Sequence, residues 1–311
     1  MMTINPTPLN YKGGQLCNDV KTLSLDWLSL HVKIPMNIIQ DVDGKPIYET
    51  ENFSLLPSAN YEVEKIEATS FHFKHIYKIY KMQGYEKIEY ASIECLPHVS
   101  FIPQNTAIIK IHNRILYTTN YHEITKELIN EFNFVFVNYS RIDYAVDFNS
   151  FIGGISPVEF INRIASNTYV FRGRKNQRFI ASEGYELHRN GKLFNALKLG
   201  SRKSDLTIQL YNKTLEQQKK ASKPWIKEFW QFNKLYESQN PVWRLEFSMK
   251  KSDKSLIDLE TGEAVADWQN IDLITPENVV KIFSIIYNQH FQVALSVEGQ
   301  TQFCRLPKLK L

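Results

Sequence analysis

The chain has 311 residues, of which 43% are hydrophobic and 23% charged, and these are the proportions of an ordinary soluble globular protein. Only 12 residues are glycine and no G-x-G-x-x-G or Walker-type loop occurs, which argues against a glycine-rich phosphate cradle. The formal net charge of +4 is a mild basic bias that is compatible with nucleic-acid binding without demonstrating it.

The pattern of hydrophobic residues predicts a mixed, sheet-rich fold. Residues 1–20 are polar and irregular and predict a flexible N-terminal arm. Period-2 patterns predict strands, in chain order, at 23–32, 71–82, 86–95, 106–113, 134–139, 141–148, 205–213 and 241–250. Helical spacing predicts helices at 121–132, 156–164, 214–221, 225–232 and 275–289. Because strands and helices do not alternate regularly, we predict an α+β fold with a large, mainly antiparallel twisted sheet and helices packed on one face.

Cysteine usage and hydropathy predict the compartment. Cys17, Cys95 and Cys304 are isolated, form no C-x-x-C or zinc pattern, and suggest a reducing environment. No apolar run reaches membrane-spanning length and no signal-peptide core is present. The sequence therefore predicts a cytoplasmic protein without membrane attachment.

Several predicted strands carry unusual polar side chains on one face. In RIDYAVDF (141–148), Arg141, Asp143 and Asp147 oppose the apolar residues. On the other strands the corresponding polar positions are His112, Tyr211, Arg244 and Glu246. Such a face is commonly just the solvated side of an antiparallel sheet. However, aspartate is disfavoured inside strands, and violations of this kind tend to mark functional sites.

These side chains suggest a divalent-metal site. Asp143, Glu246, Asp26 and His112 offer carboxylate oxygens and an imidazole, a set that suits Mg²⁺ or Mn²⁺ better than zinc. Asp143 and Asp147 lie about 13 Å apart along a straight strand, so both cannot bind one ion directly. We predict that Asp143 is the ligand and that Asp147 positions a partner or caps the strand end.

A tyrosine beside such an ion is a candidate nucleophile. Tyr211 ends the polar side of DLTIQLYNK (205–213), and its hydroxyl can form a covalent intermediate. Lys213 is a candidate for lowering the pKa of the tyrosine or for holding a phosphate. Arg244 and Arg141 are candidates for clamping a phosphate or for pairing with the acids. Together these residue types predict phosphodiester transesterification.

Three motifs carry a family resemblance. RIDYAVDF, LTIQLYNKTLEQQKK and PVWRLEFSMKK follow one another in the order of the R-[LI]-D-x-A-x-D, I-x-x-Y-[ND]-K and W-R-x-E motifs. In this order they resemble the replication initiators of the Rep-trans group of rolling-circle plasmids, together with related phage initiators and relaxases. The resemblance covers roughly residues 23–250. Where the plasmid members have an acid, this chain has His112, and the region 165–200 is hard to align.

The resemblance implies an activity and a domain plan. It implies a DNA-nicking and strand-transfer endonuclease in a bacterial cell or infected bacterial host. In this activity Tyr211 attacks one phosphate of single-stranded or hairpin origin DNA, giving a 5′-phosphotyrosine link and a 3′-OH primer. Residues 21–250 would form the catalytic nicking and ligating domain, and residues 251–311 a helical segment and basic tail for DNA binding or dimer contact. Host helicase and polymerase are the implied partners, and a homodimer is implied as well.

Two alternative functions stay open. The first is a protein that binds single-stranded nucleic acid without cutting it, with Phe71, Phe73, Tyr77 and Tyr80 as stacking surfaces. The second is a metal-dependent nuclease that uses water and leaves no protein–DNA link. For either activity, as for the initiator, the candidate DNA-binding residues are Arg141, Arg172, Arg174, Lys175, Arg202 and Lys203.

Overall fold

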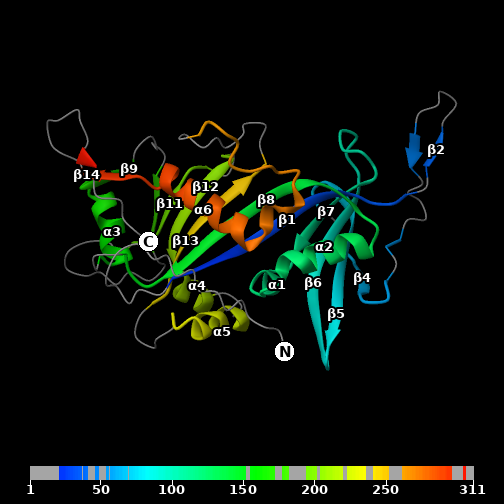
Figure 1. Cartoon of the computed structure of the whole chain (residues 1–311), viewed down its shortest axis with the longest axis horizontal. Coiled ribbons are helices and arrows are strands. Elements are labelled where there is room, and N and C mark those ends of the chain that lie inside the picture. The colour runs from blue at the N-terminus through cyan, green and yellow to red at the C-terminus, as the bar shows by residue number, and fades with distance from the viewer. Residues whose placement is uncertain are drawn as a thin grey trace. The chain divides into compact units, whose positions relative to one another are not determined.

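The structure is a computed structural model that describes most of residues 21–305 (Figure 1). Within this range the residues not described are 37, 41–45, 49–53, 56, 69, 152–154, 172–176, 182–193, 202–203, 220–222, 236–240, 252–260 and 296–303. The predicted arm at residues 1–20 lies outside the described residues. No helix in the described part is both long and apolar enough to span a bilayer.

A ten-stranded sheet is the main feature of the described residues. Its strands pair in the order β10-β11-β12-β13-β8-β1-β7-β6-β5-β4. They are β1 (Thr22–Lys33), β4 (Glu62–Ile66), β5 (Phe73–Gln83), β6 (Glu86–Pro97), β7 (Thr106–Ile111), β8 (Val135–Phe148), β10 (Gln177–Ala181), β11 (Phe194–Leu199), β12 (Leu206–Asn212) and β13 (Trp243–Lys250). The registers of β1 with β7, β4 with β5, β5 with β6, β6 with β7, and β10 through β13 are all antiparallel. The predicted α+β fold with a large, mainly antiparallel sheet is therefore confirmed.

Two short sheets accompany the large one. β9 (Tyr169–Phe171), β14 (Val293–Leu295) and β15 (Cys304–Arg305) form one, and β2 (Ile38–Gln40) and β3 (Pro46–Tyr48) form the other. The segments 134–139 and 141–148, predicted as two strands, form the single strand β8, because nothing between them interrupts the extended backbone.

The chain divides into two compact units, and β8 contributes to both. The first unit comprises residues 26–142 and 267–275. It contains α1 (Asn113–Leu116), α2 (Tyr121–Glu131) and the short 3₁₀ helix η1 (Ile271–Ile274). Tyr139 of β8 holds the segment 267–275 in this unit, since its N–H donates to the carbonyl of Trp268 and its hydroxyl to the carbonyl of Ile271 at 2.6 Å.

The β5–β6 hairpin shows how local sequence sets a register. Gln83 pairs with Glu86 across the two-residue loop, and Gly84 has a φ of +63°. An L-residue with a side chain rarely adopts this left-handed conformation, whereas glycine adopts it at little cost. The predicted antiparallel pair around Gly84 is confirmed.

Among the described residues, the second unit comprises 21–25, 143–266 and 276 onward, with α3 (Pro157–Ala165), α4 (Lys213–Lys219), α5 (Pro224–Phe232) and α6 (Pro276–His290). α3 starts as predicted, with the Ser156 hydroxyl accepting from the N–H of Glu159 at 3.1 Å. The domain boundary predicted at residue 250 stays a prediction.

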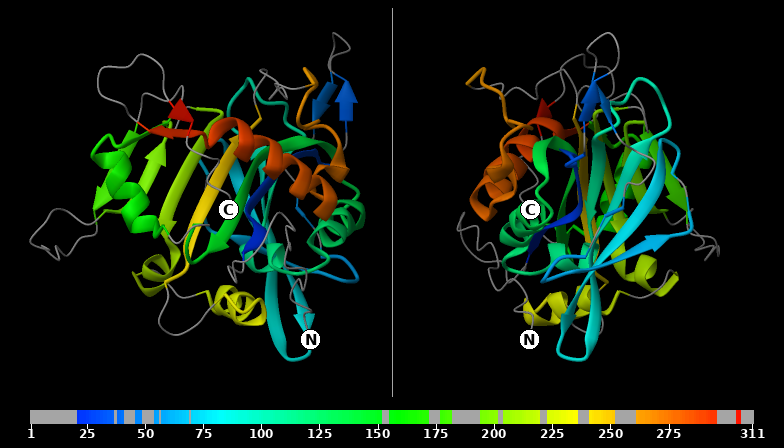
Figure 2. Two further views of the ribbon diagram at one scale, coloured as in Figure 1. Left: turned by 60° about the vertical axis from the view of Figure 1, so that its left-hand side comes forward. Right: turned by 90° about the vertical axis from the view of Figure 1, so that its right-hand side faces the viewer.

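In this unit α6 packs on one face of the sheet, and α5 contacts the other face through Trp230. Figure 2 shows α6 lying against one face of this part of the sheet. On β13, Phe247 packs edge-on against Phe283 of α6, with ring centroids 5.6 Å apart. Arg244 points to the opposite face, because residues at odd spacing alternate across a strand. On that face Trp230 of α5 reaches the same carboxylate as Arg244. Apolar periodicity marks one buried face of a strand and does not show that the polar face is covered too.

Candidate active site

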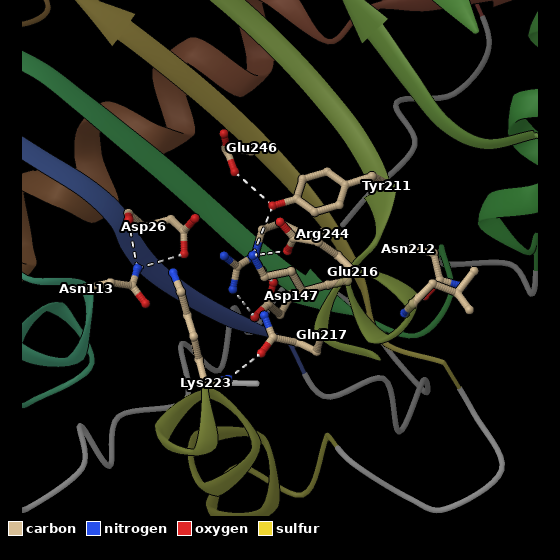
Figure 3. Close-up of polar contacts among 12 residues, drawn as sticks. Asp26, Asn113, Asp147, Tyr211, Asn212, Glu216, Gln217, Lys223, Arg244 and Glu246 are labelled. Carbon is tan, nitrogen blue, oxygen red and sulfur yellow. Dashed lines mark hydrogen bonds and ion pairs between the residues drawn. The ribbon is translucent and has the colours of Figure 1, made fainter. Parts of the chain in front are cut away.

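Tyr211 and Glu246 come together across the pairing of β12 with β13. The register sets Tyr211 opposite Arg244 and Gln209 opposite Glu246, so Tyr211 and Glu246 are diagonal neighbours on one face. A long aromatic side chain can span such a diagonal. The Tyr211 hydroxyl donates a hydrogen bond to Oε2 of Glu246 at 3.0 Å (Figure 3). Two predicted site residues that are 35 positions apart in the sequence are thus in direct contact.

Lys213 lies on the other side of the same hydroxyl. Its Nζ is 3.3 Å from the Tyr211 oxygen and 2.6 Å from Oε2 of Glu216, and its side chain is only 3% exposed. Lys213 is the first residue of α4, and its backbone N–H donates to the carbonyl of Val242 at 3.0 Å. This backbone bond holds the start of α4 against β13. The lysine is therefore directed back toward the end of β12.

The turn from β12 into α4 is stabilised locally. The Asn212 side chain accepts a hydrogen bond from the N–H of Leu215 at 2.9 Å, which satisfies a donor at the start of the helix. The Thr214 hydroxyl accepts from the N–H of Val242 at 2.8 Å. These bonds fix the geometry of the segment that carries both Tyr211 and Lys213.

Arg244 is buried and paired with an acid. Its side chain is 0% exposed, and its Nε and NH2 atoms donate to the two carboxylate oxygens of Asp147 at 2.6 and 2.7 Å. The indole N–H of Trp230 donates to the same carboxylate at 2.7 Å. Of the two alternatives predicted for Arg244, pairing with an acid is the one that the geometry favours, because a fully buried, forked ion pair does not offer the guanidinium to a phosphate. Asp147 positions a partner, as predicted.

Asp143 shares the face of Asp147, because the two residues are four positions apart on β8. It is 2% exposed, and Glu246 on the neighbouring strand is 7% exposed. The alternative that this face is only the solvated side of the sheet does not hold at these positions. The face is largely buried. Burial of two carboxylates requires compensating partners, which is a property of binding sites more than of sheet surfaces.

The remaining predicted ligands, Asp26 and His112, belong to the first unit. Oδ1 of Asp26 accepts from the Tyr117 hydroxyl at 3.0 Å and from the Asn113 side chain at 3.2 Å. His112 is the N-cap of α1, and its Nδ1 accepts from the N–H of Arg114 at 3.4 Å. Their role as ligands stays a prediction.

The candidate metal donors in the second unit are the carboxylates of Asp143 and Glu246. Among the described residues no group of three or more His, Cys, Asp or Glu side chains is arranged to hold a metal. Magnesium, however, is often bound through one or two carboxylates, with waters and substrate phosphates completing the shell. Two buried carboxylates on one sheet face, Asp143 and Glu246, fit a site of that kind and not a site built from protein ligands alone.

Of the predicted DNA-binding residues, Arg141 is described. Its guanidinium stacks over the ring of Trp27, 5.0 Å from the centroid. Arg172, Arg174, Lys175, Arg202 and Lys203 lie outside the described residues.

Two residues that sequence reasoning missed belong to the site. Glu216 follows Lys213 by three positions in a helix, a spacing that brings side chains together and is readable in NKTLEQQ (212–218). Trp230 contacts Asp147 although the two residues are 83 positions apart in the sequence, and no local sequence pattern predicts that contact.

The prediction of aromatic stacking surfaces for a pure binding protein is partly wrong. Phe73 and Tyr77 are buried in the core at 1% and 2% exposure, because they lie on the inward face of β5. Phe71 is exposed, just before that strand.

Comparisons with known proteins agree with the fold. No protein-family model matches the sequence, and no curated protein matches it. A solved structure, described as that of a rolling circle replication initiator protein from Geobacillus stearothermophilus, is similar with a TM-score of 0.51 and 14% sequence identity. The similarity covers 93% of this chain and 94% of that one. The chain therefore has a fold similar, over nearly its whole length, to that of a rolling-circle replication initiator.

Proposed function

We propose that the protein initiates replication by nicking and rejoining single-stranded origin DNA through a covalent link to Tyr211. One observation carries the proposal: the Tyr211 hydroxyl lies between a carboxylate, Glu246, and an ammonium, Lys213. A phenol needs a proton acceptor and a cation nearby to become a nucleophile at neutral pH. The fold similarity to a rolling-circle initiator supports the same function.

In the first step the phosphate is transferred from the 3′ oxygen of the DNA to the Tyr211 oxygen. The Tyr211 oxygen attacks the phosphorus, a tyrosyl O–P bond forms, and the bond from phosphorus to the 3′ oxygen breaks. The phenol proton passes to Glu246, which already accepts its hydrogen bond, and the departing 3′ oxygen takes up a proton to become the 3′-OH. Lys213 stabilises the negative charge that develops on the attacking oxygen and on the phosphate. In the reverse step a 3′-OH attacks the phosphotyrosine and releases Tyr211. This step rejoins the DNA strand.

A divalent cation, Mg²⁺ or Mn²⁺, is part of the proposal. Asp143 and Glu246, both of the second unit, would hold it. When bound, the cation supplies charge stabilisation at a non-bridging phosphate oxygen. Asp147, Arg244 and Trp230 do not touch the substrate in this proposal. They position β8 and β13, and with them Asp143 and Glu246.

The experiment is a search for the covalent adduct. The protein is incubated with Mn²⁺ and a 3′-labelled pool of single-stranded oligonucleotides with random centres, and label that survives denaturing electrophoresis on the protein is measured. Tyr211→Phe removes only the hydroxyl and should abolish the adduct. Tyr85→Phe, which alters a fully exposed tyrosine on the β5–β6 hairpin, is the matched control and should form it normally.

Each outcome separates the candidate functions. An adduct that mass spectrometry locates on Tyr211 supports the proposal. Cleavage without an adduct, unchanged in Tyr211→Phe, indicates a nuclease that uses water. Binding with neither cleavage nor adduct indicates a pure single-strand-binding protein. Either cleavage without an adduct or binding alone would overturn the proposal.

A further inference from the structure

One end of the sheet in the first unit gathers exposed aromatic rings. At this end three strands finish, β1, β4 and β6, and two strands begin, β5 and β7. The paired residues there are Lys33–Thr106, Ile66–Ile76 and Phe73–Pro97. The loops at this end carry Phe71, which is 86% exposed, and Phe101, which is 75% exposed. Exposed apolar rings that cluster at one place are more typical of an interaction surface than rings that are exposed singly.

The rings are held in a defined arrangement. His72 lies edge-on to both phenyl rings, with centroids 4.6 Å from Phe71 and 6.1 Å from Phe101. His98 fixes the loop that bears Phe71, because its Nε2 is hydrogen-bonded to the Phe71 carbonyl at 3.0 Å. The aromatic rings are therefore organised before any ligand arrives.

Exposed lysines surround this cluster. Lys33, Lys65 and Lys74 lie at the same strand ends and are exposed. Among the described residues no ion pair joins any of the three to a carboxylate, although Glu67 is exposed just after β4. The positive charges of Lys65 and Lys74 also contribute, after burial, to a lowered pKa of His75.

The opposite end of the same strands differs. Near the β5–β6 turn the cations are neutralised by neighbouring acids. The ion pairs there are Lys81–Glu127, Lys87–Glu62 and Arg114–Glu86. In the part of these strands that the structure describes, lysines without an ion pair therefore lie at the aromatic end, and paired cations lie at the other end.

We propose that this end of the first unit, comprising Phe71, His72, His98, Phe101, Lys33, Lys65 and Lys74, binds a segment of single-stranded DNA by base stacking. Exposed rings accept unpaired bases, and unpaired lysines attract phosphates, which is the combination that sequence-tolerant single-strand binding requires. In a duplex the base faces are already stacked on one another. A second copy of the chain is a poorer occupant, because a symmetric contact would bring like-charged lysines together. The inference draws on the proposed function only for the class of ligand.

The test uses fluorescein-labelled dT20 and an abasic strand of the same length, in EDTA and in a Tyr211→Phe background, so that no chemistry contributes. Fluorescence anisotropy should show that Phe71→Ala with Phe101→Ala weakens dT20 binding by about tenfold or more, with little effect on the abasic strand. Lys65→Ala with Lys74→Ala should weaken both strands and reduce the salt dependence of binding, by about 0.7 in the logarithmic slope for each lysine. Tyr85→Ala removes an exposed ring at the other end and should change nothing.

A second measurement locates the contact directly. In dT20 with iododeoxyuridine substitutions, ultraviolet light should cross-link the strand to the peptides containing Phe71 or Phe101. Unchanged dT20 binding in the double phenylalanine variant, an equal loss on the abasic strand, or cross-links confined to other segments would overturn the inference. So would sedimentation data showing that these variants break a dimer. The separate Mn²⁺ experiment tests the proposed function and not this inference. If no adduct forms there, the binding site inferred here is unaffected, and if an adduct forms, a negative binding result still overturns the inference.

Discussion

Arg244 and Asp147 form a forked ion pair in which neither side chain is exposed to solvent. The pair connects the start of β13 with the end of β8, the two strands that carry Glu246 and Asp143. Trp230 adds a third hydrogen bond from α5. The chemistry proposed at Tyr211 therefore depends on a network that never touches the substrate.

The pair predicts a large effect on stability. Asp147→Ala leaves a buried guanidinium without its partner, and removing one member of a buried pair typically costs about 3–5 kcal/mol. The free energy of unfolding should fall by about that amount in urea denaturation. The double variant Asp147→Leu with Arg244→Met replaces both charges with apolar groups and should be less destabilised than Asp147→Ala. Equal destabilisation of the two variants would contradict a dominant role for the uncompensated charge.

Lys213 should matter for chemistry more than for binding. Lys213→Met removes the ammonium beside the Tyr211 oxygen, and loss of one such donor usually lowers a rate by about 10²–10³-fold. The rate of adduct formation, measured at saturating oligonucleotide, should show this loss. Lys213→Arg should restore part of the rate, because it keeps the charge. A Lys213→Met variant with a normal rate would remove the lysine from the mechanism.

Glu216 should act through Lys213 as a positioning residue. Glu216→Gln keeps the size of the side chain but removes the charge that holds Nζ at 2.6 Å. We expect the maximal rate of adduct formation to fall by about tenfold while oligonucleotide affinity stays constant, since such indirect roles are weaker than direct ones. Glu216→Asp is the conservative rescue. If Glu216 had only a structural role, the substitution would instead lower the melting temperature, and the rate and the oligonucleotide affinity would fall together.

Metal removal gives a third check on the site. EDTA should abolish adduct formation, and Mn²⁺ or Mg²⁺ should restore it. Asp143→Asn should raise the Mn²⁺ concentration needed for half-maximal activity, because an amide oxygen binds a hard cation less strongly than a carboxylate. Asp272→Asn alters an exposed acid that pairs with Lys126 and serves as the control. An unchanged metal requirement in Asp143→Asn would exclude this residue as a ligand.

Cys95 should resist alkylation in the folded protein. Burial raises the pKa of its thiol to about 12, and the thiolate is the reactive form. In a Cys17→Ser, Cys304→Ser variant, iodoacetamide at pH 8 should modify Cys95 only after urea unfolding, as mass spectrometry would show. Because the unfolded thiol ionises at lower pH than the folded one, stability should also decrease as the pH rises through the unfolded value. Rapid labelling of the native variant would contradict the burial of this thiol.

Local sequence determined the strands, most helix positions and the turn at Gly84. Period-2 and helical spacing report which side chains must leave water, and Ser156 and Gly84 set local backbone geometry. Strand periodicity and motif order predict Tyr211 and Glu246 as site residues, and the cross-strand register puts them in contact.

Tertiary structure decided what surrounds these residues. Periodicity shows only the direction in which a side chain leaves its strand, so it could not tell that Asp143 and Arg244 would be buried beneath further elements. It also could not distinguish the buried ring of Phe73 from the exposed ring of Phe71, which precedes the strand. Whether a polar group is solvated or paired depends on chain segments far away in sequence, such as Trp230 for Asp147, and only packing brings them together.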